Sequence, residues 1–206
     1  HITGNDYFVL PPCGYLYAYP SLLNSNNQET FVQKTEESCF LMSTNSIVAW
    51  EWFGTWKRAL QTYFPRYTEA ATVKGFFTVN DPFDLPIFAF EGTEQYKIIG
   101  SGDQSIVIFR PNEWRGTVPE PIPFSRKNTL SSKEMSRRIS DLPKGTVTHV
   151  YVTSDGGADL NLIYDMVQYL KPHVKIVNQN TIVRMALERE EHKKQSRSTH
   201  RSAVFK

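Results

Sequence analysis

The amino-acid sequence predicts a mainly β protein, an antiparallel β-sandwich over residues 1–178 followed by a C-terminal helix and a basic tail over residues 179–206. Short runs of β-branched and aromatic residues recur along the chain, and turn-forming residues separate them at short intervals. Because hydrophobic residues make up 40% of the 206 residues, the chain can bury one good core. These observations indicate a single sandwich domain with a polar extension.

The first part of the chain is predicted to form short strands, at 7–10, 15–19 and 30–33. Between 39 and 64, helix and strand are both possible, and the alternation of residues after Gly54 favours a bend that leads into a strand. The turn residues that argue against long helices near the N-terminus are Pro11, Pro12, Gly14, Pro20 and the stretch 24–27.

The middle of the chain is predicted to add four strands, because its apolar runs are short and are bounded by turn formers. No regular crossover helix is indicated in this half, which favours antiparallel pairing. The predicted strands are 71–79, 87–90, 95–99 and 105–109.

The C-terminal third mixes helix and strand signals. Ser131 is a good N-cap for a helix over 131–139, and a second helix is predicted over 181–194, after a strand at 174–177. The sequence Ser-Asp-Gly-Gly at 154–157 predicts a hairpin between 146–153 and 158–164. The alternative is a helix over 158–170, whose N-terminus could then receive a phosphate.

Catalytic and metal-binding patterns are weak. Cys39 has Gln33 six residues upstream and His149 far downstream, a set that resembles the papain-like cysteine proteases, whereas a buried structural cysteine is the simpler interpretation. The five histidines are too dispersed to form a metal site. We therefore predict no catalytic residue, no metal and no cofactor.

Two surface features favour assembly with partners. Four bulky rings surround Gly54 and are candidates for contacts between subunits, namely Trp50, Trp52, Phe53 and Trp56. The tail after residue 192 carries basic residues and no acid, and it is either a solvated terminus or a contact for RNA or an acidic partner. Its basic residues are Lys193, Lys194, Arg197, Arg201 and Lys206.

The aromatic run and glycine turn in 47–64, the segment 106–123 and the segment 146–164 resemble the jelly-roll capsid proteins of picorna-like viruses. The resemblance implies a two-sheet jelly roll in a virion shell, packed against copies of itself or homologous subunits, with possible RNA contact and no enzymatic activity. It also implies release from a polyprotein, which would explain the start at His1.

The alternatives are a structural subunit of an intracellular ribonucleoprotein, such as an organellar ribosome, and a papain-like protease that uses Cys39 and His149. No apolar run in the sequence reaches the roughly 20 residues that a membrane-spanning helix needs.

Overall fold

The centre of the molecule is a four-stranded mixed sheet with the strand order β1-β2-β4-β3. The computed structural model describes residues 10–11, 13–51, 53–79, 90, 94–110, 112–114, 130–152 and 160–204. The strands are β1 (Ser46–Ala49), β2 (Gly75–Thr78), β3 (Tyr96–Ile99) and β4 (Ile106–Phe109).

Most of the pairing is parallel. Strands β1, β2 and β4 run parallel, β3 pairs antiparallel with β4, and Leu10 forms a parallel bridge to Ile47 beside β1. The short strand β5 (Glu113–Trp114), which begins four residues after the end of β4, pairs in parallel with β6 (Tyr151–Val152). All residues of β2 and β4 are buried, as expected for strands of a sheet that is covered on both faces.

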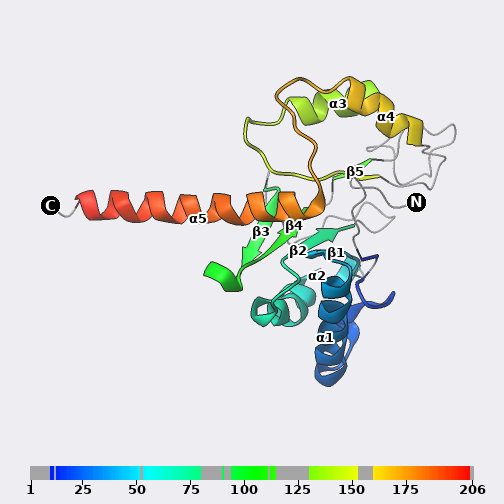
Figure 1. Cartoon of the computed structure of the whole chain (residues 1–206), viewed down its shortest axis with the longest axis vertical. Coiled ribbons are helices and arrows are strands. Elements are labelled where there is room, and N and C mark those ends of the chain that lie inside the picture. The colour runs from blue at the N-terminus through cyan, green and yellow to red at the C-terminus, as the bar shows by residue number, and fades with distance from the viewer. Residues whose placement is uncertain are drawn as a thin grey trace.

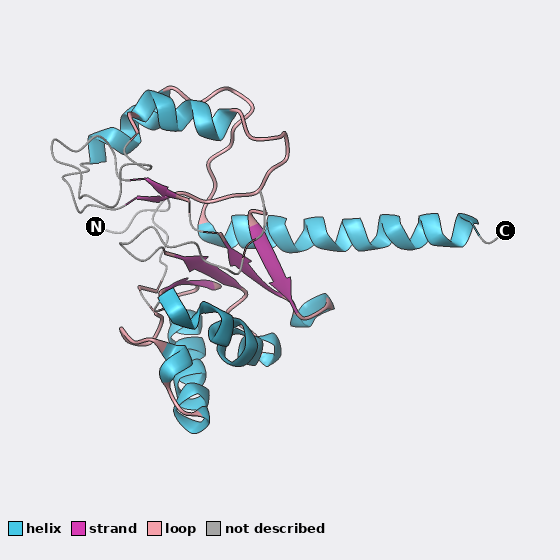
Figure 2. Cartoon of the chain, turned by 180° about the vertical axis from the view of Figure 1, so that it is seen from behind, coloured by secondary structure: helices cyan, strands magenta, loops and turns pink. Residues whose placement is uncertain are grey.

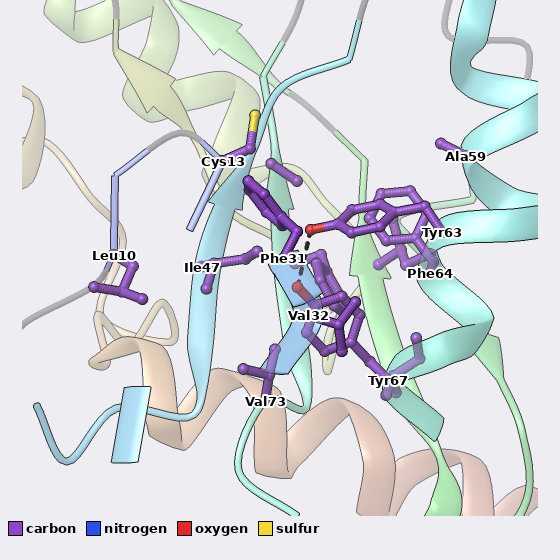
Figure 3. Close-up of a cluster of buried hydrophobic side chains, with 14 of the residues drawn as sticks. Leu10, Cys13, Phe31, Val32, Ile47, Ala59, Tyr63, Phe64, Tyr67 and Val73 are labelled. Carbon is purple, nitrogen blue, oxygen red and sulfur yellow. Dashed lines mark hydrogen bonds between the residues drawn. The ribbon is translucent and has the colours of Figure 1, made fainter. Parts of the chain in front are cut away.

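One face of the sheet is covered by α1 (Ser25–Leu41) and by a helical stretch over residues 53–69 (Figures 1 and 2). That stretch consists of η2 (Phe53–Thr55), α2 (Trp56–Arg58), η3 (Ala59–Tyr63) and η4 (Phe64–Glu69). Helix α1 begins after Asn24, whose side chain accepts a hydrogen bond from the Asn27 N–H. Figure 3 shows the cluster beneath, in which the hydroxyls of Tyr63 and Tyr67 lie 3.0 Å apart.

The other face is covered by α5 (Gln179–Val204), which continues well beyond the sheet (Figures 1 and 2). Val183 and Ala186 of this helix pack with Phe77, Val107 and other apolar residues. At Gly75 a Cβ atom would lie 2.2 Å from Val183 Cγ2, so only glycine permits this close approach of helix and strand.

A third group of helices packs beside β5 and β6. Helix α3 (Ser132–Ser140) starts with a complete capping box formed by Ser131 and Glu134, and α4 (Leu160–Gln168) packs next to it. Their apolar faces meet Trp114, whose indole N–H donates to the Leu130 carbonyl at 2.8 Å. None of the helices in the described ranges is both long and apolar enough to cross a membrane.

The predicted jelly-roll β-sandwich is wrong, because the sheet is small, largely parallel and covered by helices on both faces. The strand predicted at 30–33 lies inside α1, and the one predicted after Gly54 lies in the helical stretch over 53–69. Segment 174–177 is not a strand, and residues 160–168 are helical, as in the alternative interpretation.

Other predicted elements are confirmed. Strands lie within the predicted ranges 71–79, 95–99 and 105–109, and the helix after Ser131 is present. Most of 87–90 and the Asp-Gly turn at 155–156 lie outside the described residues. The division of the chain after residue 178 remains a prediction.

Candidate functional site

The parallel strands place their carboxyl ends along one edge of the sheet, which is where open α/β sheets bind their ligands. The segment after the Leu10 bridge arrives at this edge, next to the end of β1. There the Cys13 thiol donates a hydrogen bond to the Trp50 carbonyl at 2.8 Å and accepts one from the Trp50 N–H at 3.2 Å. We call residues 13–21 the aromatic loop.

The aromatic loop is fixed against α1 through Gly14. This residue has φ of +105°, and a Cβ atom there would lie 2.7 Å from Thr35 Cγ2 and 2.8 Å from Thr35 Oγ1, so the position requires glycine. The next residue, Tyr15, donates its backbone N–H to Thr35 Oγ1 at 3.1 Å. Glycine therefore lets the loop lie directly on the helix.

The loop presents tyrosine rings to solvent. Tyr15 and Tyr17 are 51% and 59% exposed, and the Tyr17 ring meets the Trp50 ring edge to face, with 5.4 Å between centroids. Partial burial of its hydroxyl is the main reason that the pKa of Tyr17 is raised, and the neighbouring Tyr19, Cys13 and Tyr151 add to the shift.

Glu51 anchors the far end of the aromatic loop. Its carboxylate accepts hydrogen bonds from the Ser21 N–H at 2.9 Å, the Ser21 hydroxyl at 2.5 Å and the Thr55 hydroxyl at 3.0 Å. The side chain is buried, and this burial raises the pKa of Glu51 although the three donors act in the opposite direction. Glu51 is thus a positioning residue that ties the loop to the helical stretch over 53–69.

Polar side chains follow the end of β4. The side-chain Oε1 of Gln95 accepts from the Asn112 side-chain amide at 3.2 Å and from the Thr148 hydroxyl at 2.7 Å. Next to them, the His149 ring lies against Phe77 and Phe109, with both ring nitrogens buried and without a hydrogen bond that meets normal geometry. Loss of hydration lowers the pKa of His149 to about 4, and the Thr78 backbone only partly opposes this shift.

The predicted protease residues do not come together. Cys39 belongs to the core on the α1 face of the sheet, whereas His149 packs on Phe77 and Phe109, whose side chains point to the α5 face. Burial raises the pKa of Cys39 to about 12, the opposite of what a thiolate nucleophile needs. Gln33 is bound to Glu37 on α1. Cys39 is a structural core residue, and the protease alternative is wrong.

Only some of the predicted contact residues belong to the described part of the chain. Trp56 is only 2% exposed and stacks on Phe64, Trp50 is partly buried, and neither Trp52 nor the Phe53 side chain is among the described parts. Lys193 and Lys194 lie exposed on α5, while the side chains of Arg197 and Arg201 and the whole of Lys206 are outside the described part. A single chain does not test either contact, so both remain predictions.

In the part of the chain that the structure describes, no three His, Cys, Asp or Glu side chains gather in a way that could hold a metal ion. The aromatic loop itself was missed at the sequence level, because the alternation of Tyr15, Tyr17 and Tyr19 is also the pattern of a strand. The signal that could have found it is the turn-forming frame around those tyrosines, Gly14 before them and Pro20 after them.

Comparison with solved structures gives a match to a protein described as a putative hydrolase from Bacteroides thetaiotaomicron VPI-5482. The TM-score is 0.65 at 15% sequence identity, and the alignment covers 91% of this chain and 34% of the other. The likeness establishes a shared fold, and the chain spans about a third of that protein's length. No curated protein matches the chain.

A family model described as "GxGYxYP putative glycoside hydrolase C-terminal domain" matches residues 1–186. The pattern in this description fits residues 14–20, since Gly14, Tyr17, Tyr19 and Pro20 take their expected places and Leu16 replaces the second glycine. Leu16 is not among the described residues with positive φ, so its backbone accepts a side chain without strain.

These matches overturn the interpretation as a non-enzymatic capsid subunit and the ribonucleoprotein alternative, and with them the localisation in a virion. A family of hydrolases is not a family of shell proteins, and the parallel sheet is not a jelly roll. The chain belongs to the family described as "GxGYxYP putative glycoside hydrolase C-terminal domain".

Proposed function

We propose that this chain supplies a sugar-binding surface of a glycoside hydrolase, formed by the aromatic loop and Trp50 at the carboxyl edge of the sheet. One observation carries the proposal: Tyr17, which stands at a tyrosine of the family pattern, packs its ring on Trp50 at this edge, and Gly14 of the same pattern lies directly on α1. A signature that builds an exposed aromatic surface at the ligand-binding edge of an α/β sheet favours a role in binding rather than in core packing alone.

The chemistry of this surface suits a carbohydrate. A pyranose ring has an apolar face of C–H groups that packs on an aromatic ring, and a rim of hydroxyls that needs hydrogen-bond partners. Tyr15 and Tyr17 offer both, because each combines an exposed ring with a hydroxyl that can donate or accept. The polar cluster of Gln95, Asn112 and Thr148 adds amide and hydroxyl groups near the ends of neighbouring strands.

The proposal assigns sugar binding, not the acid and base of hydrolysis, to the described residues. Glycoside hydrolysis uses two carboxyl groups that both reach the substrate. Glu51 does not qualify, because it is 1% exposed and its oxygens already accept hydrogen bonds from Ser21 and Thr55.

The test is a titration of the protein with a panel of neutral and acidic oligosaccharides, in which binding is measured by tryptophan fluorescence and by calorimetry. For the best ligand, Tyr17→Ala should weaken binding about tenfold, the equivalent of losing about 1.4 kcal/mol of ring contact. Tyr17→Phe separates the contribution of the ring from that of the hydroxyl. The matched control is Tyr169→Ala, because Tyr169 is similarly exposed, at 56%, just after α4. Equal effects of Tyr17→Ala and Tyr169→Ala would refute the proposal.

A further inference from the structure

The open edge of β3 carries backbone groups without partners. The Arg110 N–H donates to the Gln95 carbonyl at 2.8 Å, and Gln95 and Arg110 continue the register in which Tyr96 pairs with Phe109. In an antiparallel ladder every second residue bonds to the neighbouring strand, so the N–H and C=O groups of Tyr96 and Ile98 point away from β4. No described residue bonds to them.

A groove runs along this edge. It has a volume of about 640 Å³ and is bounded by β3, by residues 146 and 147 and by one side of α5. Figure 1 shows β3 at the outer edge of the sheet, next to α5. At one end of the groove the Thr148 hydroxyl bonds to the Gln95 side chain, and at the other end Gly100 lines it. A guest strand would lie along Tyr96 and Ile98, whose backbone groups point into this space.

The groove carries an excess of positive charge. Its lining includes four cations, Lys97, Arg189, Lys193 and Lys194, and two anions, Glu94 and Glu190, which leaves a net charge of +2. Lys97 pairs with Glu94 at 3.6 Å, and Lys193 pairs with Glu190. Arg189 and Lys194 form no ion pair among the described residues.

We infer that the open edge of β3 binds an extended acidic peptide segment, which adds a strand to the sheet and places its carboxylates near Arg189 and Lys194. Exposed strand edges recognise peptides through main-chain hydrogen bonds, and neighbouring side chains select the sequence. A second copy of this chain is a poor guest, because two positively charged grooves would face each other. The family match ends at residue 186, so Arg189, Lys193 and Lys194 lie beyond the matched part.

The test uses a fluorescent eight-residue peptide that alternates glutamate with valine, and it measures anisotropy at low and high salt. We expect binding that weakens as salt rises, together with slower hydrogen exchange of the Tyr96 and Ile98 amides. The double variant Arg189→Glu with Lys194→Glu should bind at least about tenfold more weakly. The control is Lys57→Glu, because Lys57 is exposed on α2 at the opposite face of the sheet.

Two N-methylated peptides test the strand geometry on the unaltered protein. In one peptide the methyl groups are on the backbone nitrogens of the odd-numbered residues, and in the other they are on those of the even-numbered residues. Because successive N–H groups of a strand point to opposite sides, each peptide is blocked along one edge only. We call these two patterns the odd and the even series. Addition of a strand predicts that one series loses binding and the other keeps it, since only one edge bonds to β3. Equal binding of both series would overturn the inference. So would displacement of the peptide by a short RNA or an acidic oligosaccharide of equal charge, since the groove would then be a general anion surface.

Discussion

Replacing Glu51 removes the anchor of the aromatic loop, and the structure gives the size of the effect. Glu51→Ala leaves the N–H and hydroxyl of Ser21 buried without an acceptor, because Ser21 is itself fully buried. Each unpaired buried donor costs about 1–3 kcal/mol, so the sum is about 2–6 kcal/mol. Since the change also removes a buried carboxyl group whose own burial costs free energy, we expect a loss in the lower half of that range, about 2–4 kcal/mol.

The assay is urea unfolding of the wild type, Glu51→Ala and Glu51→Gln at pH 7, with the free energy of unfolding extrapolated to water. Glutamine keeps the size of the side chain and one acceptor oxygen, so it should cost about 1–2 kcal/mol. A loss below about 0.5 kcal/mol for Glu51→Ala, the size of a typical surface substitution, would refute the role of Glu51 as an anchor.

The pH dependence of the same variants tests the charge state of Glu51. Burial raises its pKa above the ordinary 4.5, so the folded protein holds this proton more tightly than the unfolded chain does. The stabilisation is therefore complete below pH 4.5 and is lost as the pH rises through the raised value. The advantage of the wild type over Glu51→Gln should shrink from pH 4 to pH 7. An advantage that grows with pH would mean that the donors from Ser21 and Thr55 outweigh burial.

Three further predictions concern the loop and the core. Gly14→Ala should cost about 2–4 kcal/mol in urea unfolding, because of the positive φ and the clash with Thr35, and Thr35→Ala in the same chain should recover part of this loss; no recovery would mean that the clash is not the cause. Neither Cys13 nor Cys39 should react with iodoacetamide in the native protein, because burial raises both pKa values to about 12, and mass spectrometry of native labelled protein would reveal a contradicting adduct. The lowered pKa of His149, about 4, means that its stabilising contribution is present above pH 6.5 and is lost as the pH falls towards 4; His149→Phe should remove this dependence, and an unchanged pH profile in the variant would contradict it.

The sequence predicts individual strands better than it predicts how they are arranged. The apolar runs at β2 and β4 are recognisable as strands, and all of their residues are buried. Such runs are typical of parallel sheets covered on both faces, yet their shortness and the turn residues between them also fit an antiparallel sandwich. The helices that cover the sheet decide between the two. Helix α5 agrees with the helix predicted over 181–194, but α1 and the helical stretch over 53–69 lie where strands were predicted.

Helix α1 shows why. Two of its five buried residues are polar, so the apolar stripe is hard to detect in the sequence although the five recur at helical spacing, namely Gln28, Phe31, Val32, Thr35 and Cys39. Asn24 caps the helix, but asparagine is equally typical of turns, and the stretch 24–27 was predicted to form one. The candidate site depends on this helix, since Thr35 fixes Gly14 and Tyr15, and for that reason the sequence alone did not reveal the site.

The most direct test of the central claim is an amide chemical-shift map of the isotope-labelled chain, recorded during titration with the oligosaccharide that binds best. If the aromatic loop binds sugar, the shifts should concentrate in residues 13–21 and at the Trp50 backbone and indole N–H, and Tyr17→Ala should need about ten times as much sugar to approach saturation. Shifts confined to β3 and α5, or the same shifts in Tyr17→Ala, would show that sugar binds elsewhere on the molecule and would contradict the account.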